Sequence, residues 1–250
     1  MSGIVHLVGA GPGAADLLTV RATRLLGEAD VVFHDALISR EILSLVKARA
    51  VPVGKRSGRH STAQAFINKQ LLDAALKHRT VVRLKGGDPM LFGRAQEEID
   101  FLQARGVTVE VVPGVSAAFA ASADLGVSLT QRALARSVAF VTPRVAPGAP
   151  ESSWLAAAVA ADTAAIYMAA GEAAGIARAL VGGGKPASTP VAVVTDASLP
   201  GSMVRFATLE SIARSGLPPT PGPALLLLGE VYRARAAADA LRGRNASQAA

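Results

Sequence analysis

The segment of residues 81–94 holds the side chains best suited to chemistry, because several charges surround one tight turn. A short strand rich in β-branched residues leads into Gly86 and Gly87, which are followed by an acid and a proline. Glycine adopts backbone angles that are closed to other residues and lets a ligand approach the main chain closely. A purely structural turn needs no such concentration of charge, so the segment indicates a ligand site. Its charged residues are Arg83, Lys85, Asp88 and Arg94.

Two further stretches of the chain are basic and contain no acid. Five cations lie between Lys47 and Arg59, and a second interval contains Arg132, Arg136 and Arg144. With a formal net charge of +7, this pattern suits either a nucleic acid or a small polyanion. No aromatic platform accompanies the cations and no helix-turn-helix pattern is present, so we expect a small polyanion and no nucleic acid.

The composition excludes several classes of site. The chain has no cysteine, which rules out disulfides, thiolate zinc sites and cysteine nucleophiles. Its four histidines are not at ligand spacing on a helix face, so we expect no metal. Residues 1–13 lack the pattern of a signal peptide, and no run of about 20 apolar residues would span a membrane. We therefore expect a cytoplasmic protein that has no membrane contact.

Strand and helix patterns alternate along the first half of the chain. Strands are expected at residues 4–8, 31–34, 81–85 and 107–112, with Asp16 as the N-cap of the first helix. This order predicts a largely parallel sheet that is covered by helices. In open α/β sheets, ligands bind outside the carboxyl ends of the strands, where the glycine turn would lie.

The second half repeats the alternation after a break at Pro113 and Gly114. The fold class expected is therefore α/β, with two domains whose sheets are mostly parallel. The domains would span residues 1–114 and 115–235, and residues 236–250 would form a flexible tail. Strands of the second domain are expected at residues 138–141, 164–168, 191–194 and 224–228, with an edge strand at 205–207.

The glycine-rich residues 9–13 invite a dinucleotide-binding interpretation. Their spacing is G-x-G-x-G, whereas the dinucleotide fingerprint is G-x-G-x-x-G followed by an acid about 20 residues later. Asp30 and Asp35 fall in that range, but Pro12 removes an N–H that a pyrophosphate would need. We favour a different ligand and keep a dinucleotide oxidoreductase as an alternative.

Taken together, these segments resemble the class III tetrapyrrole methylases that use S-adenosylmethionine, and within them the uroporphyrinogen-III C-methyltransferases. The resemblance covers roughly residues 3–232. Gly-Lys-Arg-x-Gly-x-His and Arg-Leu-Lys-Gly-Gly-Asp-Pro are specific to the subfamily, whereas Gly-x-Gly-Pro-Gly is shared across the wider family. The matching segments are residues 8–13, 17–19, 35–39, 53–60, 83–94 with 97–98, and 111–117.

The resemblance implies that S-adenosylmethionine is the cofactor and lies in a cleft between the two domains. A neutral nucleoside with an amino-acid tail needs main-chain donors, apolar walls and a carboxylate. By motif position, the residues lining it would be Pro12, Gly86, Gly87, Asp88, Leu91, Ser116, Ala117, Met168 and Ala197.

The resemblance also implies the substrate, uroporphyrinogen III, a reduced macrocycle rich in carboxylates. Methylation at two ring carbons would give precorrin-2 by way of precorrin-1, which feeds cobalamin, sirohaem or haem d1 synthesis. A homodimer is implied as well. The residues expected to bind the substrate are Lys55, Arg56, Arg59, Arg94 and Arg132.

Four residues are candidates for catalysis. Asp35 and Lys55 match the positions that the family assigns as proton acceptor and proton donor. Arg94 and Glu97 lie one helical turn apart, but an arginine, with a pKa above about 12, is a poor base. Arg94 is therefore expected to bind a carboxylate, with Glu97 orienting it. For Asp35, an N-cap role remains an equal alternative.

The second half departs from the family pattern in several places. Gln131 stands where histidine is usual, Met168-Ala169 replaces Met-Gly, and residues 195–198 read Thr-Asp-Ala-Ser in place of Glu-Asn-Gly-Thr. Each added Cβ narrows the room beside the cofactor. Two alternatives therefore stay open: a methylase of a later precorrin, and a non-catalytic relative that binds S-adenosylhomocysteine or a tetrapyrrole.

Overall fold

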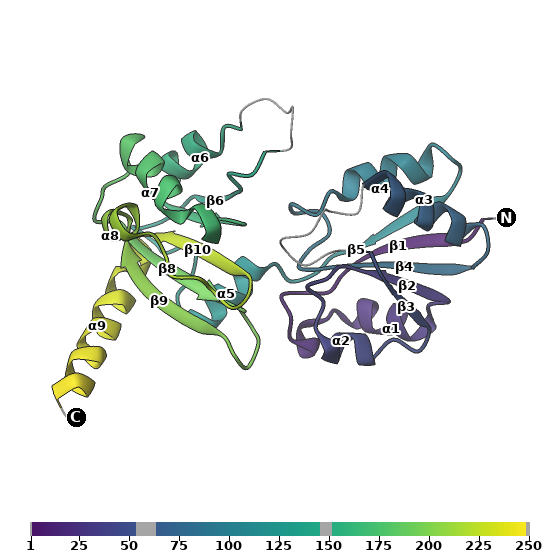
Figure 1. The fold of residues 1–250 in the computed structure, drawn as a ribbon, viewed down its shortest axis with the longest axis horizontal. Helices are drawn as coiled ribbons and strands as arrows, with labels where there is room; N and C mark the ends of the chain where they lie inside the picture. The colour runs from purple at the N-terminus through teal and green to yellow at the C-terminus, as the bar shows by residue number, and fades with distance from the viewer. Residues whose placement is uncertain (1, 54–63, 146–151, 249–250) are drawn as a thin grey trace. The chain divides into compact units, whose positions relative to one another are not determined.

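The computed structural model describes residues 2–53, 64–145 and 152–248 (Figure 1). The chain divides into two compact units, Met1–Ala117 and Ala118–Ala250. In its described part, each unit contains one five-stranded sheet with helices packed on it. The predicted α/β fold class with two sheets is confirmed.

The sheet of the first unit is parallel throughout, with strand order β3-β2-β4-β1-β5. All of its carboxyl ends therefore lie at one edge. The short strand β3 was not predicted, because an exposed edge strand carries no apolar alternation. The bounds are β1 Ile4–Gly9, β2 Val31–His34, β3 Arg49–Pro52, β4 Thr80–Lys85 and β5 Thr108–Val112.

Helices cover both faces of this sheet (Figure 1). Helices α1 (Val20–Glu28) and α2 (Arg40–Ser44) pack on one face. Helices α3 (Gln64–Ala75) and α4 (Ala95–Gln103) pack on the other. The expectation that Asp16 caps the first helix is wrong. A 3-10 turn, Ala15–Leu17, intervenes, and the Thr19 hydroxyl accepts the hydrogen bond from the N–H of Ala22 instead.

The sheet of the second unit is mixed, with strand order β6-β7-β10-β8-β9. Only β6 and β7 pair in parallel among its described strands, although parallel pairings prevail over the two sheets together. Strand β9 follows β8 without a crossover helix, so the two pair antiparallel. Strand β9 lies at the edge, as predicted, and β10 lies in the centre. The bounds are β6 Val138–Val141, β7 Thr163–Ile166, β8 Pro190–Thr195, β9 Met203–Thr208 and β10 Ala224–Gly229.

Strand direction decides which loops of the second unit share an edge. Strand β10 runs antiparallel to both β7 and β8, so β7 and β8 run in the same direction. Strand β6 is parallel to β7. The loops that follow β6, β7 and β8 therefore lie along one edge of this sheet.

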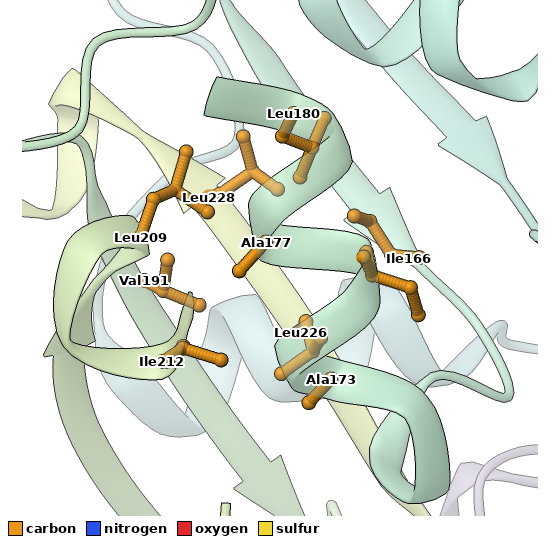
Figure 2. Close-up of a pocket in the computed structure, with 10 residues that line it drawn as sticks. Ile166, Ala173, Ala177, Leu180, Val191, Leu209, Ile212, Leu226 and Leu228 are labelled. Carbon is orange, nitrogen blue, oxygen red and sulfur yellow. The ribbon is translucent and has the colours of Figure 1, made fainter. Parts of the chain in front are cut away.

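The core of the second unit is apolar and closely packed. Helices α7 and α8 direct aliphatic side chains onto β10, around a cavity of only ≈ 10 Å³ (Figure 2). A space of that size holds one water molecule at most, so it is no ligand site.

The helix bounds are α5 Ala117–Leu125, α6 Trp154–Ala160, α7 Ala173–Gly182, α8 Leu209–Ser215 and α9 Arg233–Gln248, with 3-10 turns at Ala170–Glu172 and Glu230–Tyr232. Helix α9 thus continues through most of the predicted tail.

Candidate functional site

Three loops meet at the carboxyl edge of the first sheet, after β1, β4 and β5. The N–H of Gly11 donates to the carbonyl of Gly87 at 3.2 Å, and the N–H of Gly87 donates back to Gly11 at 2.7 Å. A Cβ on Gly9 would lie 2.6 Å from the nitrogen of Gly114, so no larger residue fits there. We call these loops, residues 9–13, 86–88 and 114, the glycine platform.

The carboxylate of Asp88 ties the platform together. Its Oδ1 accepts from the N–H of Met90 at 2.8 Å, and its Oδ2 accepts from the N–H of Gly114 at 3.0 Å. The acid therefore fixes both its own turn and the neighbouring loop. Because a carboxylate has about four acceptor sites, these two bonds leave capacity for a ligand.

One glycine of the platform has no structural requirement within the described chain. A Cβ on Gly86 would meet nothing within 4 Å, and its φ lies outside the left-handed region. Gly87 also faces open space, but its φ of +67° favours glycine on its own. Open main chain at Gly86 is what the close approach of a ligand requires.

All but one of the other residues predicted to bind the cofactor lie in loops that follow strands. In the first unit, Pro12 and Leu91 are half-buried, and Ser116 is buried just before α5. In the second unit, Met168 is exposed after β7 and Ala197 is buried after β8. Ala117 begins α5.

Backbone strain gathers in the same loops. Among the described residues, six other than glycine have a positive φ, and five of them follow β4, β7 or β8. Such conformations cost about 1–3 kcal/mol each and occur most often at functional sites. The five are Phe92, Arg94, Met168, Asp196 and Ser198.

Charged side chains are buried beneath the glycine turn. Arg83, Lys85 and Glu98 are each 3% exposed or less. Glu98 accepts from Arg83 Nε at 3.2 Å and from Lys85 Nζ at 3.0 Å. Arg83 Nη2 also donates to Oδ1 of Asp35 at 2.5 Å. Every charge of this ionic cluster (Arg83, Lys85, Glu98 and Asp35) thus has an opposite partner, without which burial would cost several kcal/mol.

Asp35 is the member of the ionic cluster that reaches the surface. It follows β2 at the carboxyl edge, and its side chain is 33% exposed. The N-cap of α2 is Ser39, whose hydroxyl accepts from the N–H of Ile42. The N-cap alternative for Asp35 is therefore wrong. Its carboxylate is held by a buried guanidinium and is partly open to solvent.

The cluster also changes the acidity of its lysine. Burial lowers the pKa of Lys85, and the adjacent cation Arg83 lowers it further. Glu98 and Asp35 act in the opposite direction. The two carboxylates therefore offset part of the effect of burial on the pKa of Lys85.

Arg94 and Glu97 form a separate, exposed pair at the start of α4. Arg94 Nε lies 2.8 Å from Oε1 of Glu97, and Nη2 lies 2.7 Å from Oε2. These hydrogen bonds lower the pKa of Glu97 and raise that of Arg94. Glu97 thus fixes the orientation of the guanidinium, in the arrangement expected from their spacing.

Only one of the remaining basic residues predicted to bind the substrate lies in the described part of the chain. Lys55, Arg56 and Arg59 lie outside the described residues. Arg132 is exposed in the second unit. Two residues earlier in the sequence, Thr130 lines a cavity of ≈ 280 Å³ together with Phe119 and Phe140.

Sequence reasoning missed Glu98 as a member of the site. The signal was present, since Ala95, Glu98 and Leu102 share one helix face and all three are buried. Glu97, one residue earlier, falls on the exposed face.

Of the described residues, no group of three or more His, Cys, Asp or Glu is placed to hold a metal. No described helix is long and apolar enough to cross a membrane.

Comparisons with known proteins place the chain in a family. The family model "Tetrapyrrole (Corrin/Porphyrin) Methylases" matches residues 5–213. A siroheme synthase of Psychrobacter sp. is 44% identical over 234 residues, which are 92% of this chain and 48% of the relative. The chain thus spans about half the length of the curated relatives it matches.

Solved structures match over nearly their whole length. Uroporphyrin-III C-methyl transferase from Thermus thermophilus, complexed with S-adenosyl homocysteine, is 40% identical with a TM-score of 0.82. The match covers 93% of this chain and 94% of that one. A cobalt precorrin-4 methyltransferase is 29% identical, with a TM-score of 0.78 and coverage of 91% and 95%.

Proposed function

Since the chain belongs to the tetrapyrrole (corrin/porphyrin) methylase family, we propose that it transfers methyl groups from S-adenosylmethionine to uroporphyrinogen III. The observation that carries this proposal is the 40% identity over 94% of the Thermus enzyme, whose structure holds S-adenosyl homocysteine. The matching part of the siroheme synthases is about half of each, so only methyl transfer is assigned to this chain.

The glycine platform is the part of the chain suited to hold the cofactor. When bound, S-adenosylmethionine supplies a methyl group on a positively charged sulfur. Gly86 and Gly87 leave the main chain open to it, and Asp88 holds the turn. The further contacts are assigned to Pro12, Leu91, Ser116, Ala117, Met168 and Ala197.

Basic side chains are assigned to the carboxylates of the macrocycle. Arg94 offers an exposed guanidinium already oriented by Glu97. A guanidinium binds a carboxylate through two parallel hydrogen bonds, which fixes orientation as well as adding affinity. The remaining substrate contacts are assigned to Arg132, Lys55, Arg56 and Arg59.

The reaction requires a group that accepts a proton. Each new carbon–carbon bond forms as the methyl–sulfur bond breaks, and the macrocycle must then lose a proton. Asp35 is assigned as the proton acceptor because it is a partly exposed carboxylate at the carboxyl edge of the sheet, held by Arg83. Lys55 is assigned as proton donor. Two transfers give precorrin-2 by way of precorrin-1, with S-adenosylhomocysteine as the second product.

The proposal also includes the cellular location and the oligomeric state of the enzyme. We assign it to the cytoplasm, as a homodimer that binds a small-molecule polyanion. Its product would enter cobalamin, sirohaem or haem d1 synthesis. Sedimentation equilibrium tests the dimer, because a single species with the 25.4 kDa mass of one chain would contradict it.

A direct assay tests the function. Purified protein is incubated without oxygen with S-adenosylmethionine and enzymatically made uroporphyrinogen III, and the product mass is followed. Two added methyl groups are expected, with two equivalents of S-adenosylhomocysteine. The Asp35→Asn variant should bind S-adenosylhomocysteine normally and form less than about a hundredth of the product.

The same assay separates the alternatives. Binding of S-adenosylhomocysteine without any gain in product mass would indicate the non-catalytic relative. Methylation of a later precorrin but not of uroporphyrinogen III would indicate the other methylase, for which the lower identity of 29% gives less support. Binding of NADH without S-adenosylhomocysteine would indicate an oxidoreductase.

A further inference from the structure

One buried charge has no place in the proposed reaction. Glu98 is 0% exposed on α4, on the face that packs against the sheet. A carboxylate in that position costs several kcal/mol of desolvation, which an apolar side chain would avoid. An apolar residue there would leave the buried Arg83 and Lys85 without this counter-ion, so Glu98 serves the two cations and not packing alone.

Glu98 fixes the orientation of Arg83 from one side. Its Oε1 accepts from Arg83 Nε at 3.2 Å and from Gln64 Nε2 at 3.0 Å. The other nitrogens of Arg83 donate to the carbonyl of Leu84 and to Asp35. The guanidinium therefore cannot rotate without breaking a hydrogen bond, and its position determines where Asp35 is held.

Glu98 also balances the charge next to Asp35. Two cations, Arg83 and Lys85, face two carboxylates, Glu98 and Asp35. Without the charge of Glu98, Asp35 would be the sole counter-ion in the ionic cluster for both cations. Its carboxylate would then be held more firmly in the ionised form and would be a weaker base.

We propose that Glu98 is a positioning residue, which through Arg83 sets both the place and the basicity of the Asp35 carboxylate. The proposal rests on the function assigned to Asp35. Among the described residues, the charged and titratable groups that face Asp35 are Arg83 and Lys85 from β4, Glu98 from α4 and the neighbouring His34, whose Nδ1 lies 3.0 Å from the Asp35 carbonyl.

The first test measures Asp35 directly and needs no activity. The carboxyl carbon of Asp35 is titrated by ¹³C NMR in the full-length protein and in the Glu98→Gln variant. We expect the titration midpoint to fall by about one pH unit, because an unbalanced cation favours the carboxylate. Glu28→Gln is the matched control, since it removes an exposed carboxylate from α1 and should leave the midpoint unchanged. An unchanged midpoint in Glu98→Gln would overturn the proposal.

A second variant keeps the test decisive if Glu98→Gln does not fold. Arg83→Lys retains the net charge, but a lysine lacks the planar fork that spans two carboxylates. Asp35 should lose its partner, and its midpoint should rise by about one unit. A midpoint that stays at the wild-type value would show that Arg83 does not connect the two acids.

Steady-state kinetics then distinguish a Glu98 that positions Asp35 from a Glu98 that only stabilises the fold. In Glu98→Gln, kcat should fall about tenfold or more and its acid limb should move to lower pH, with both KM values within about twofold. Glu98→Asp, which keeps the charge, should return the acid limb to its wild-type position. A variant that loses only thermal stability, with an unmoved pH profile, contradicts the proposal. If the wild type forms no product but the NMR midpoint moves, the proposed function fails and the coupling of Glu98 to Asp35 stands.

Discussion

Gly9 and Gly114 pack backbone against backbone, so closely that a Cβ on Gly9 would lie 2.6 Å from the nitrogen of Gly114. The contact joins the ends of β1 and β5, and β5 is the outermost strand of the parallel sheet. Gly86 lies in the adjacent loop, yet a Cβ there would point into open space. Two glycines of the same platform therefore have different physical reasons to be glycine.

The first prediction uses that contrast. Gly9→Ala forces two backbones apart and should lower the free energy of unfolding by about 2–3 kcal/mol. Gly86→Ala should change it by less than about 0.5 kcal/mol but weaken S-adenosylhomocysteine binding about tenfold or more, because the added methyl fills the cofactor's space. Urea unfolding and calorimetric titration measure the two effects. Tight binding by Gly86→Ala would remove that residue from the cofactor site.

The second prediction concerns the hydrogen bonds of Asp88. In Asp88→Ala, the N–H groups of Met90 and Gly114 lose their acceptor, at about 1–2 kcal/mol in total. The loosened turn should weaken S-adenosylhomocysteine binding, as calorimetry would record. Asp88→Asn keeps one carbonyl acceptor, so its affinity for S-adenosylhomocysteine should lie between those of the wild type and Asp88→Ala. Equal affinity in all three proteins would contradict the anchoring role.

Arg94 gives a third prediction, in which function and stability separate. Its pair with Glu97 is more than half exposed, and such pairs contribute at most about 1 kcal/mol. Arg94→Ala should therefore unfold at nearly the wild-type urea concentration and bind S-adenosylhomocysteine almost normally. Turnover of uroporphyrinogen III should drop sharply, with KM raised. Arg233→Ala, which breaks a similar exposed pair with Glu230, is the control. Unchanged turnover would exclude Arg94 from the site.

The fourth prediction follows from a buried histidine in β1. Burial lowers the pKa of His6, against the opposing effect of Glu110, 3.3 Å from Nδ1. As the pH falls below about 6.5, the unfolded chain binds this proton before the folded protein does, so stability decreases through that window. His6→Gln should flatten the pH dependence of the urea midpoint between pH 7.5 and 5.5. The exposed His78→Gln should not. If the urea midpoint of His6→Gln depended on pH as steeply as that of the wild type, the prediction would be wrong.

Local sequence patterns predicted much of the first unit. The strands that form β1, β2, β4 and β5 are apolar runs that stop at turn residues, and these patterns are visible without tertiary contacts. The glycine turn after β4 was located for the same reason. Strand β3 was missed because its pairing with β2 depends on a neighbour rather than on its own composition.

The antiparallel pairings of the second sheet were not predictable in the same way. Alternating helices and strands favour parallel pairing, but β9 follows β8 directly and β10 enters the centre of the sheet. Strand order is a long-range property, which depends on how the elements pack together. The pattern of residues within each strand does not encode it.

The sequence by itself determined the alternation of elements, the glycine turns at the strand ends and the concentration of charge beside one of them. Only the tertiary structure decided which charges meet: Arg83 reaches Asp35, 48 residues away, and Glu98 is buried while Glu97 is exposed. The physical reason is that spacing along the chain fixes which face of an element a side chain occupies. Which residue the side chain then contacts depends on the order of the strands and on the helix packed across them.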